Sequence, residues 1–170
     1  EANEAVIPYL LNDQIQSSSA MVPCPWFNDI ADWYKKHPEM DIGLHLTLTS
    51  EWKNYRWGPV SNSSSVPELI DTEGYLWRRV IDVASRTPVA TIEKEIRAQI
   101  ERAYERGIKP GHIDTHMGTL YSKVEYTEAF FNIAMEYGIP ATVIEFTPSR
   151  VQQFRKQGYP ITPRLIETGK

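Results

Sequence analysis

The segment IGLHLTLT between Ile42 and Thr49 alternates strictly, and this alternation constrains the fold more than any other feature of the chain. Isoleucine or leucine occupies every second position, whereas glycine, histidine and threonine occupy the positions between them. Successive side chains of a strand point to opposite faces, so the pattern predicts a strand with one apolar and one polar face. His45 belongs to the polar face.

Helical and extended patterns alternate along the rest of the chain. The spacing of apolar residues predicts helices over 2–10, 26–34, 92–106, 130–137 and 151–156, and strands over 17–22, 42–49, 112–116 and 141–144. In the helix over 92–106 the expected buried face is formed by Ile92, Ile96, Ile100 and Ala103. Such alternation is typical of α/β proteins, and we expect a (β/α) barrel-like fold with mostly parallel strands and helices outside.

Residues 50–79 follow neither period, and the stretch is rich in aromatic side chains. These are Trp52, Tyr55, Trp57, Tyr75 and Trp77. Linkers seldom hold so many aromatics, so we interpret the stretch as a functional loop or lid. Because 41% of the 170 residues are apolar, the chain can form one substantial core. We expect a single domain over residues 1–170, with the loop or lid inserted at about residues 50–90.

The charge balance and the cysteine content narrow the classes of partner and compartment. Eighteen Lys and Arg against 22 Asp and Glu give a net charge of −4, without the basic stripe that nucleic acid binding needs. No apolar run approaches the length of a membrane-spanning helix, so we expect a soluble protein without a membrane partner. Cys24 is the single cysteine, which excludes an internal disulfide and a CxxC zinc site and fits a cytoplasmic location.

A second histidine-bearing segment, HIDTH, places His112, Asp114 and His116 at every second position. His45 and this group lie near the carboxyl ends of predicted strands, and in a parallel β/α architecture these ends meet at one rim. Imidazole nitrogens and a carboxylate are ordinary ligands for zinc and also bind other transition metals. Two histidines and one aspartate leave a coordination position open, where an ion could activate water for hydrolysis.

Each of these residues also has a structural explanation. Taken alone, His45 is more often a hydrogen-bonded strand residue than a metal ligand. The group at 112–116 is harder to explain in this way, because three titratable side chains on one face of a buried strand are costly unless paired or metal-bound. His37 follows two lysines at the end of a predicted helix, where a surface role is the better explanation.

The aromatic residues of the loop have two explanations that the sequence leaves open. Trp52 and Trp57 are either core or loop staples, or exposed rings that stack on sugars beside the metal rim. We assign them, with Arg56, as candidate substrate-binding residues, although arginines in this stretch are most simply solvated charges. Exposed aromatics in the same stretch could also serve a contact between two copies of the chain in a homodimer.

The two histidine-bearing segments, in this order, resemble the YdjC-like (ChbG-type) carbohydrate deacetylases. In that family a GLHxxLT strand and an HxDxH strand contribute to one metal site, and this sequence has GLHLTLT at 43–49 and HIDTH at 112–116. Asn3-Glu4-Ala5 and the segment SSSAMVPCPWF at 17–27 also look like the family. The resemblance therefore covers most of the chain.

The resemblance implies a barrel-like hydrolase that removes acetyl groups from N-acetylated sugars such as chito-oligosaccharides. It implies a divalent ion, magnesium first and zinc or another transition metal as alternatives, held by His45 and His116. His112 and Asp114 would take part in catalysis by orienting ligands or substrate. The expected partner is a small carbohydrate.

The chain also departs from the family pattern at both ends. Family members begin with a strand carrying Asp-Asp-x-Gly, whose aspartates supply a third ligand and a general base, and this chain begins just after that place. It ends before the strands that usually carry another histidine, so we expect a truncated deacetylase domain. The alternatives are a non-catalytic carbohydrate-binding or regulatory module of the same fold, and a metal-dependent phosphoesterase that would use Arg56, Arg78 and Arg79.

Overall fold

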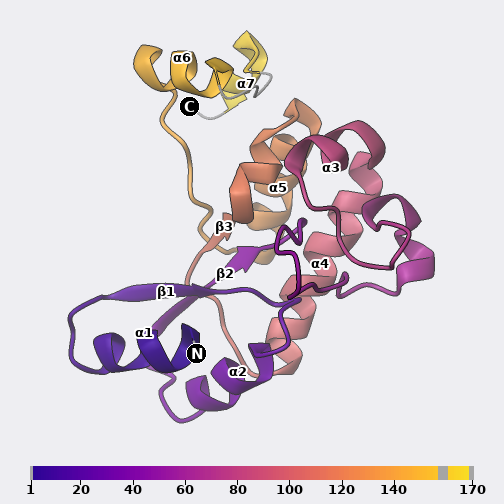
Figure 1. Ribbon diagram of the computed structural model, residues 1–170. Helices are drawn as coiled ribbons and strands as arrows, with labels where there is room; N and C mark the ends of the chain where they lie inside the picture. Colours follow the sequence, from indigo (N-terminus) through magenta and orange to yellow (C-terminus); the bar gives the residue numbers. More distant parts are fainter. Residues whose placement is uncertain (1, 157–160, 169–170) are drawn as a thin grey trace.

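Three parallel strands lie at the centre of the computed structural model, which describes residues 2–156 and 161–168. They are β1 (Ser17–Ala20), β2 (Asp41–Leu46) and β3 (Ile113–Thr115), and they lie side by side in the order β1-β2-β3 (Figure 1). β2 pairs in parallel with both neighbours. The prediction of an α/β protein with parallel strands is confirmed, while residues 1, 157–160 and 169–170 of the predicted domain lie outside the described residues.

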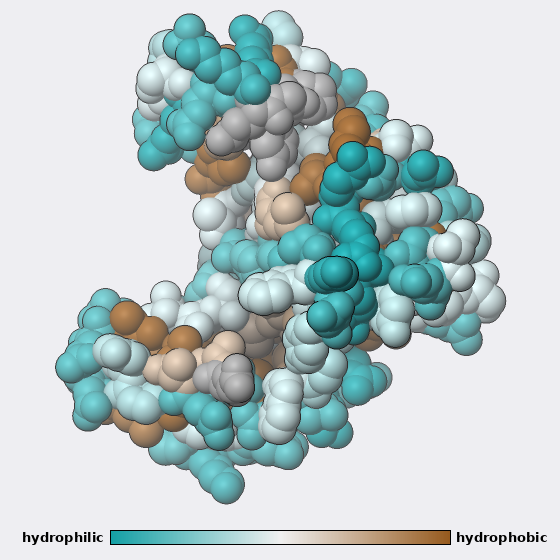
Figure 2. Space-filling view, in the orientation of Figure 1, coloured by the Kyte–Doolittle hydropathy of each residue, from teal (hydrophilic) through white to brown (hydrophobic). Residues whose placement is uncertain are grey.

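Helices precede, connect and follow these strands. They are α1 (Ala2–Leu11), α2 (Phe27–Tyr34), α3 (Val80–Arg86), α4 (Val89–Glu105), α5 (Val124–Tyr137), α6 (Pro148–Lys156) and α7 (Pro163–Thr168). α4 packs against α5 beside the sheet, whereas α6 and α7 follow an extended segment at the top of Figure 1. The surface is hollowed between the α1–α2 end and the α6–α7 end (Figure 2). Among the described residues, no helix has the length and apolar character needed to cross a membrane.

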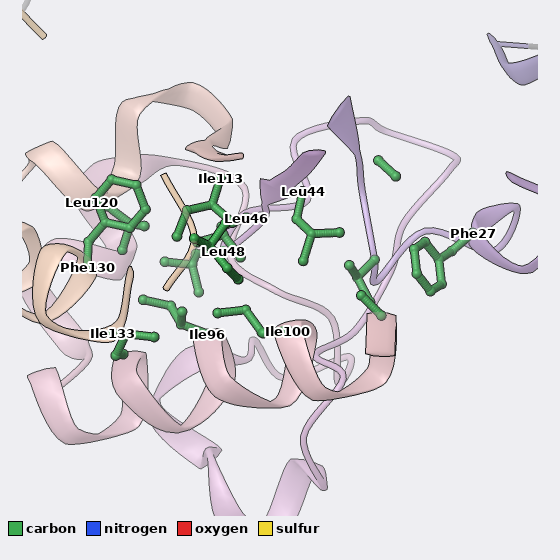
Figure 3. Close-up of a cluster of buried hydrophobic side chains, with 14 of the residues drawn as sticks. Phe27, Leu44, Leu46, Leu48, Ile96, Ile100, Ile113, Leu120, Phe130 and Ile133 are labelled. Atoms are coloured by element: carbon green, nitrogen blue, oxygen red, sulfur yellow. The ribbon is translucent and has the colours of Figure 1, made fainter. Parts of the chain in front are cut away.

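The main core forms where the apolar face of β2 meets α4 and α5 (Figure 3). Its side chains without solvent exposure include Leu44, Leu46, Leu48, Ile96, Ile100 and Phe130. Because side chains alternate along a strand, burial of the leucines turns His45 to the opposite face of the sheet. The predicted apolar faces of the strand over 42–49 and of the helix over 92–106 are confirmed.

The strand predicted over 42–49 ends three residues early, at Leu46. The backbone N–H of Thr47 donates to Oε1 of Gln99 at 3.0 Å, and Nε2 of Gln99 donates to the Thr47 carbonyl at 2.7 Å. A side chain of α4 therefore satisfies both backbone groups, which a neighbouring strand would otherwise bind. Because Gln99 has no solvent exposure, this pair of hydrogen bonds ties the end of β2 to the core.

The strand predicted over 141–144 does not form. Ala141 makes a single parallel bridge with Ile113. The Ile113 N–H donates to the carbonyl of Pro140 at 2.8 Å, and the Thr142 N–H donates to the carbonyl of Ile113 at 2.9 Å. β3 has only three residues, because the chain turns at His116 into a short 3-10 helix, η3 (His116–Tyr121). Pairing along this edge therefore stops after one bridge.

The stretch predicted as a loop or lid packs against the rest of the molecule. It contains two short 3-10 helices, η1 (Ser63–Ser65) and η2 (Pro67–Leu69), and is followed by α3. Its buried apolar side chains between residues 50 and 79 are Trp57, Val66, Leu69 and Leu76. The backbone N–H groups of Val60 and Ser61 each donate to the Glu95 carboxylate of α4 at 2.9 Å. Glu95 thus fastens the stretch to the helix, and its function as a lid stays a prediction.

Glu95 should give folding stability a pH dependence. Burial raises the pKa of this carboxyl above its ordinary value of 4.5, against hydrogen bonds from Val60, Gln99 and Ser61 that lower it. The folded protein therefore keeps a proton that the unfolded chain has already released, so the free energy of unfolding should fall as pH rises from 4.5 towards the folded pKa. In urea unfolding, Glu95→Gln should flatten this part of the pH profile. An unchanged slope would contradict the assignment.

Candidate functional site

The polar face of the sheet gathers titratable side chains from neighbouring strands. The register places His45 of β2 opposite Asp114 of β3, and His45 Nδ1 lies 2.6 Å from Asp114 Oδ1. Ser19 of β1 donates through its hydroxyl to the second oxygen, Oδ2, of Asp114 at 3.3 Å. Asp114 is therefore held from both sides, by the strand next to it and by the far edge of the sheet.

His116 is the first residue of η3, and its ring contacts the ring of His45 at the end of the sheet. His45 Nε2 and His116 Nδ1 are 3.1 Å apart, although the two residues are 71 positions apart in sequence. The rings meet edge to face, with centroids 5.1 Å apart and an angle of 72° between their planes. On its other side, His116 Nε2 lies 3.0 Å from Oε2 of Glu51. The structure thus brings together the two histidines that the family resemblance implies as metal ligands.

Two carboxylates determine which ring nitrogens carry protons. An ionised carboxylate only accepts hydrogen bonds, so His45 donates through Nδ1 to Asp114, and His116 donates through Nε2 to Glu51. In neutral rings, the lone pairs then lie on His45 Nε2 and His116 Nδ1, which are the nitrogens that face each other. Facing lone pairs repel unless a proton or a cation lies between them.

This pair fits two neighbouring ligands of one ion. With metal–nitrogen bonds of about 2.0–2.1 Å, two ligand nitrogens lie about 2.9 Å apart in octahedral geometry and about 3.4 Å apart in tetrahedral geometry. The observed 3.1 Å falls in this range. Metal-bound histidines also commonly donate their other N–H to a carboxylate, as His45 and His116 do. Within residues 2–156 and 161–168 no three His, Cys, Asp or Glu side chains form a metal-holding group, so these residues offer two ligands.

His112 directly precedes β3 and belongs to the same network, but its side chain lies beside the first residues of β2. Its Nε2 is 3.1 Å from Ser19 Oγ, and its Nδ1 is 3.4 Å from Asp41 Oδ1. The imidazole occupies the space above Gly43, which has no side chain. His112 therefore reaches Asp114 through the Ser19 hydroxyl, and its contact with the histidine pair is indirect.

Gly43 should accept no larger residue while His112 is in place. A Cβ at position 43 would lie 2.4 Å from Nε2 of the His112 ring, so Gly43→Ala must displace the imidazole. We expect this change to lower the free energy of unfolding by about 1–3 kcal/mol, the usual cost of overpacking. In a His112→Ala background the same change should cost much less, as measured by urea unfolding. Equal costs in the two backgrounds would contradict the proposed contact.

The three residues assigned to substrate binding lie in different environments. Trp52 is 61% exposed, whereas Trp57 is 4% exposed and donates through its indole N–H to the Thr49 carbonyl at 3.0 Å. The Arg56 side chain is 5% exposed and forms a 2.8 Å ion pair with Asp71. Arg56 is therefore not the solvated charge expected from the sequence. Trp57 and Arg56 hold the loop together, and of the three only Trp52 offers an open ring face to a ligand.

Sequence reasoning does not single out two members of the network. Glu51 continues the spacing of the polar positions from His45, but it lies beyond the end of β2, where alternation no longer determines the face. Ser19 is one of three consecutive serines, and only the pairing of β1 with β2 places it, rather than its neighbours, opposite Gly43. A search for carboxylates at even spacing after a histidine-bearing strand could have found Glu51.

Comparison with known proteins gives relatives of this chain. The carbohydrate deacetylase of Thermoanaerobacter pseudethanolicus is 28% identical over 98% of this chain and 63% of its own length. The carbohydrate deacetylase of Brevibacillus brevis is 32% identical over 74% of this chain and 47% of its own length. The chain thus spans 63% of the length of the first relative and 47% of the length of the second.

A solved structure and a family model give the fold and the family. A protein from Enterococcus faecalis V583, described as a cellobiose-phosphate cleavage protein, superimposes with a TM-score of 0.68 and 24% identity. The match covers 84% of this chain and 54% of that protein, and it is consistent with the barrel-like α/β fold expected from the sequence. The sequence model of YdjC-like proteins matches residues 1–167. The chain belongs to the YdjC-like protein family.

Proposed function

We propose that this protein removes acetyl groups from N-acetylated sugars, with chito-oligosaccharides as the substrate class. The observation that carries the proposal is the pair of imidazole nitrogens, from His45 and His116, that face each other at 3.1 Å while a carboxylate backs each ring. The relatives named carbohydrate deacetylases supply the class of reaction. Full activity is proposed for the protein in its natural length.

In this proposal His45 and His116 hold a divalent ion. The family resemblance implies magnesium first, whereas imidazole ligands by themselves suit zinc or another transition metal. A bound ion would lower the pKa of a water molecule and polarise the acyl oxygen. Asp114 keeps His45 in the tautomer whose Nε2 is free to bind, and Ser19 steadies Asp114 by donating to its second oxygen. These contacts fix the direction of the His45 ring before any ligand arrives.

Trp52 is the residue that we propose for sugar binding. It follows Glu51 directly in sequence, and its ring is open to solvent. Arg78 donates to the backbone carbonyl of Trp52 at 2.7 Å, which fixes this part of the loop. An indole combines a broad apolar face with a polar edge, which suits the apolar face of a sugar ring.

The arginines of the loop favour an acetylated sugar over a phosphoester. Arg56 pairs with Asp71, and Arg79 pairs with Asp82 at 2.7 Å. Arg78 is engaged by the carbonyl of Trp52. Cationic side chains aimed at the transferring phosphoryl group assist phosphoester hydrolysis, and Arg56 and Arg79 instead pair with nearby carboxylates.

Acetate release from N,N′-diacetylchitobiose tests the proposal. The protein in its full natural length would be assayed with magnesium, zinc or cobalt, and again after treatment with a chelator. We expect release with at least one ion and its loss after chelation. Sugar binding without acetate release would favour the non-catalytic carbohydrate-binding module, and release that survives complete metal removal would contradict the role of the ion.

A further inference from the structure

We propose that Glu51 is a positioning residue that acts through His116 and keeps the histidine pair open for an ion. This inference rests on the function proposed above and names a residue for that site which neither the sequence patterns nor the family resemblance assigns. Glu51 lies beyond β2, at the start of the long loop, and its side chain is partly buried. Its carboxylate contacts the ring of His116 on the side away from His45.

The carboxylate of Glu51 has two different partners. Oε2 lies 3.0 Å from His116 Nε2, and Oε1 accepts a hydrogen bond from the indole N–H of Trp52 at 3.0 Å. One oxygen is therefore committed to the exposed ring of the loop, and the other to the imidazole. The indole N–H occupies Oε1, and Oε2 accepts from His116.

Glu51 decides between two states of the histidine pair. With the proton of His116 on Nε2 and donated to Glu51, the Nδ1 lone pair faces His45 and can bind a cation. If Glu51 did not accept that proton, His116 could carry it on Nδ1 and donate it to His45 Nε2, which is 3.1 Å away. The two histidines would then bind each other, and an ion would have to break that hydrogen bond. Glu51 thus prevents the pair from closing on itself.

Asp114 gives His45 the matching support. Asp114 Oδ1 accepts a hydrogen bond from His45 Nδ1 at 2.6 Å, so the Nε2 lone pair of His45 also faces His116. The two carboxylates come from different parts of the chain, one from β3 and one from the loop after β2. Both inner nitrogens are available for an ion only while each ring keeps its proton on the outer nitrogen. Loss of either carboxylate should therefore weaken ion binding.

Two measurements on the protein in its natural length test this role. The tautomer of His116 would be read from the ¹⁵N chemical shifts of its ring without added metal, and the affinity for zinc and for magnesium would be measured by titration calorimetry. Glu51→Ala should move the His116 proton from Nε2 to Nδ1 and weaken ion binding by about 10- to 100-fold, the usual effect of removing a partner of a metal ligand. Glu51→Gln keeps an oxygen that can accept the hydrogen bond from His116 Nε2. This variant should therefore retain the His116 tautomer and lose less affinity for the ion.

Two variants serve as matched controls. Glu73→Gln changes a carboxylate of the same loop that contacts Arg56 rather than a histidine, and it should leave both readings unchanged. Trp52→Phe removes only the hydrogen bond to Oε1, and His116 should keep its tautomer because Oε2 is untouched. If the wild type binds an ion and Glu51→Ala changes neither the tautomer nor the affinity, the inference is overturned and the proposed function stands. A wild type that binds no divalent ion would overturn both.

Discussion

Replacement of His45 with alanine is expected to abolish tight ion binding and to lower acetate release by about three to four orders of magnitude. The pair of nitrogens that lie 3.1 Å apart is reduced to His116 Nδ1 alone. Asp114 also loses the hydrogen bond that it accepts from His45 Nδ1 at 2.6 Å. Metal-ion catalysis contributes several kcal/mol to the stabilisation of a transition state, and each 1.36 kcal/mol corresponds to about a tenfold change in rate. Metal content and acetate release of the purified variant would be measured together.

His37→Ala is the matched control for this loss. His37 follows α2, stacks on Trp33 with ring centroids 4.8 Å apart, and lies 3.5 Å from Glu39, away from the histidine pair. Its removal should leave metal content and turnover unchanged. Ion affinity and turnover of His45→Ala within tenfold of the wild type would contradict the assignment of His45 as a ligand.

The largest loss of stability is expected from Gln99→Leu. Leucine has a similar size but makes no hydrogen bonds, so the N–H and the carbonyl of Thr47 would lose the partners that now lie at 3.0 and 2.7 Å. Glu95 would lose the N–H that Gln99 donates to it at 2.9 Å. The same Glu95 oxygen keeps the hydrogen bond from the Val60 N–H, so two backbone groups are left unsatisfied. Each costs about 1–3 kcal/mol, so the free energy of unfolding should fall by about 2–6 kcal/mol.

Gln153→Leu controls for the change in side-chain chemistry. Gln153 lies on the exposed surface of α6, where such a substitution usually changes stability by less than about 0.5 kcal/mol. Both variants would be unfolded in urea at neutral pH. A loss below about 1 kcal/mol for Gln99→Leu would show that Thr47 finds other partners and that the polar contact does not hold the end of β2.

Periodicity predicts the elements that bury one regular face, and it fails where a side chain replaces a strand. The leucines of β2 and the isoleucines of α4 are found where their spacing places them. The end of β2 depends on Gln99, which binds the backbone of Thr47 although the two residues are 52 positions apart in sequence. No local sequence pattern predicts that contact. The missing strand over 141–144 has a different cause: its neighbour β3 turns at His116, which leaves a single bridge between Ile113 and Ala141.

The site shows a similar division. Even spacing along two histidine-bearing strands is enough to expect that His45 and His116 meet, because parallel strands bring their carboxyl ends to one edge. Composition cannot distinguish the buried Trp57 from the exposed Trp52, since both are tryptophans of the same irregular stretch. Even spacing from His45 makes Glu51 a candidate, but only the folded chain shows that the loop after β2 turns its carboxylate towards His116.

Diffraction from crystals of the natural-length protein soaked in cobalt or zinc tests the central claim most directly. We expect one anomalous peak between the rings, about 2.0–2.3 Å from both His45 Nε2 and His116 Nδ1. The absence of any peak near the two nitrogens at high metal concentration, or a peak that contacts neither nitrogen, would contradict the account.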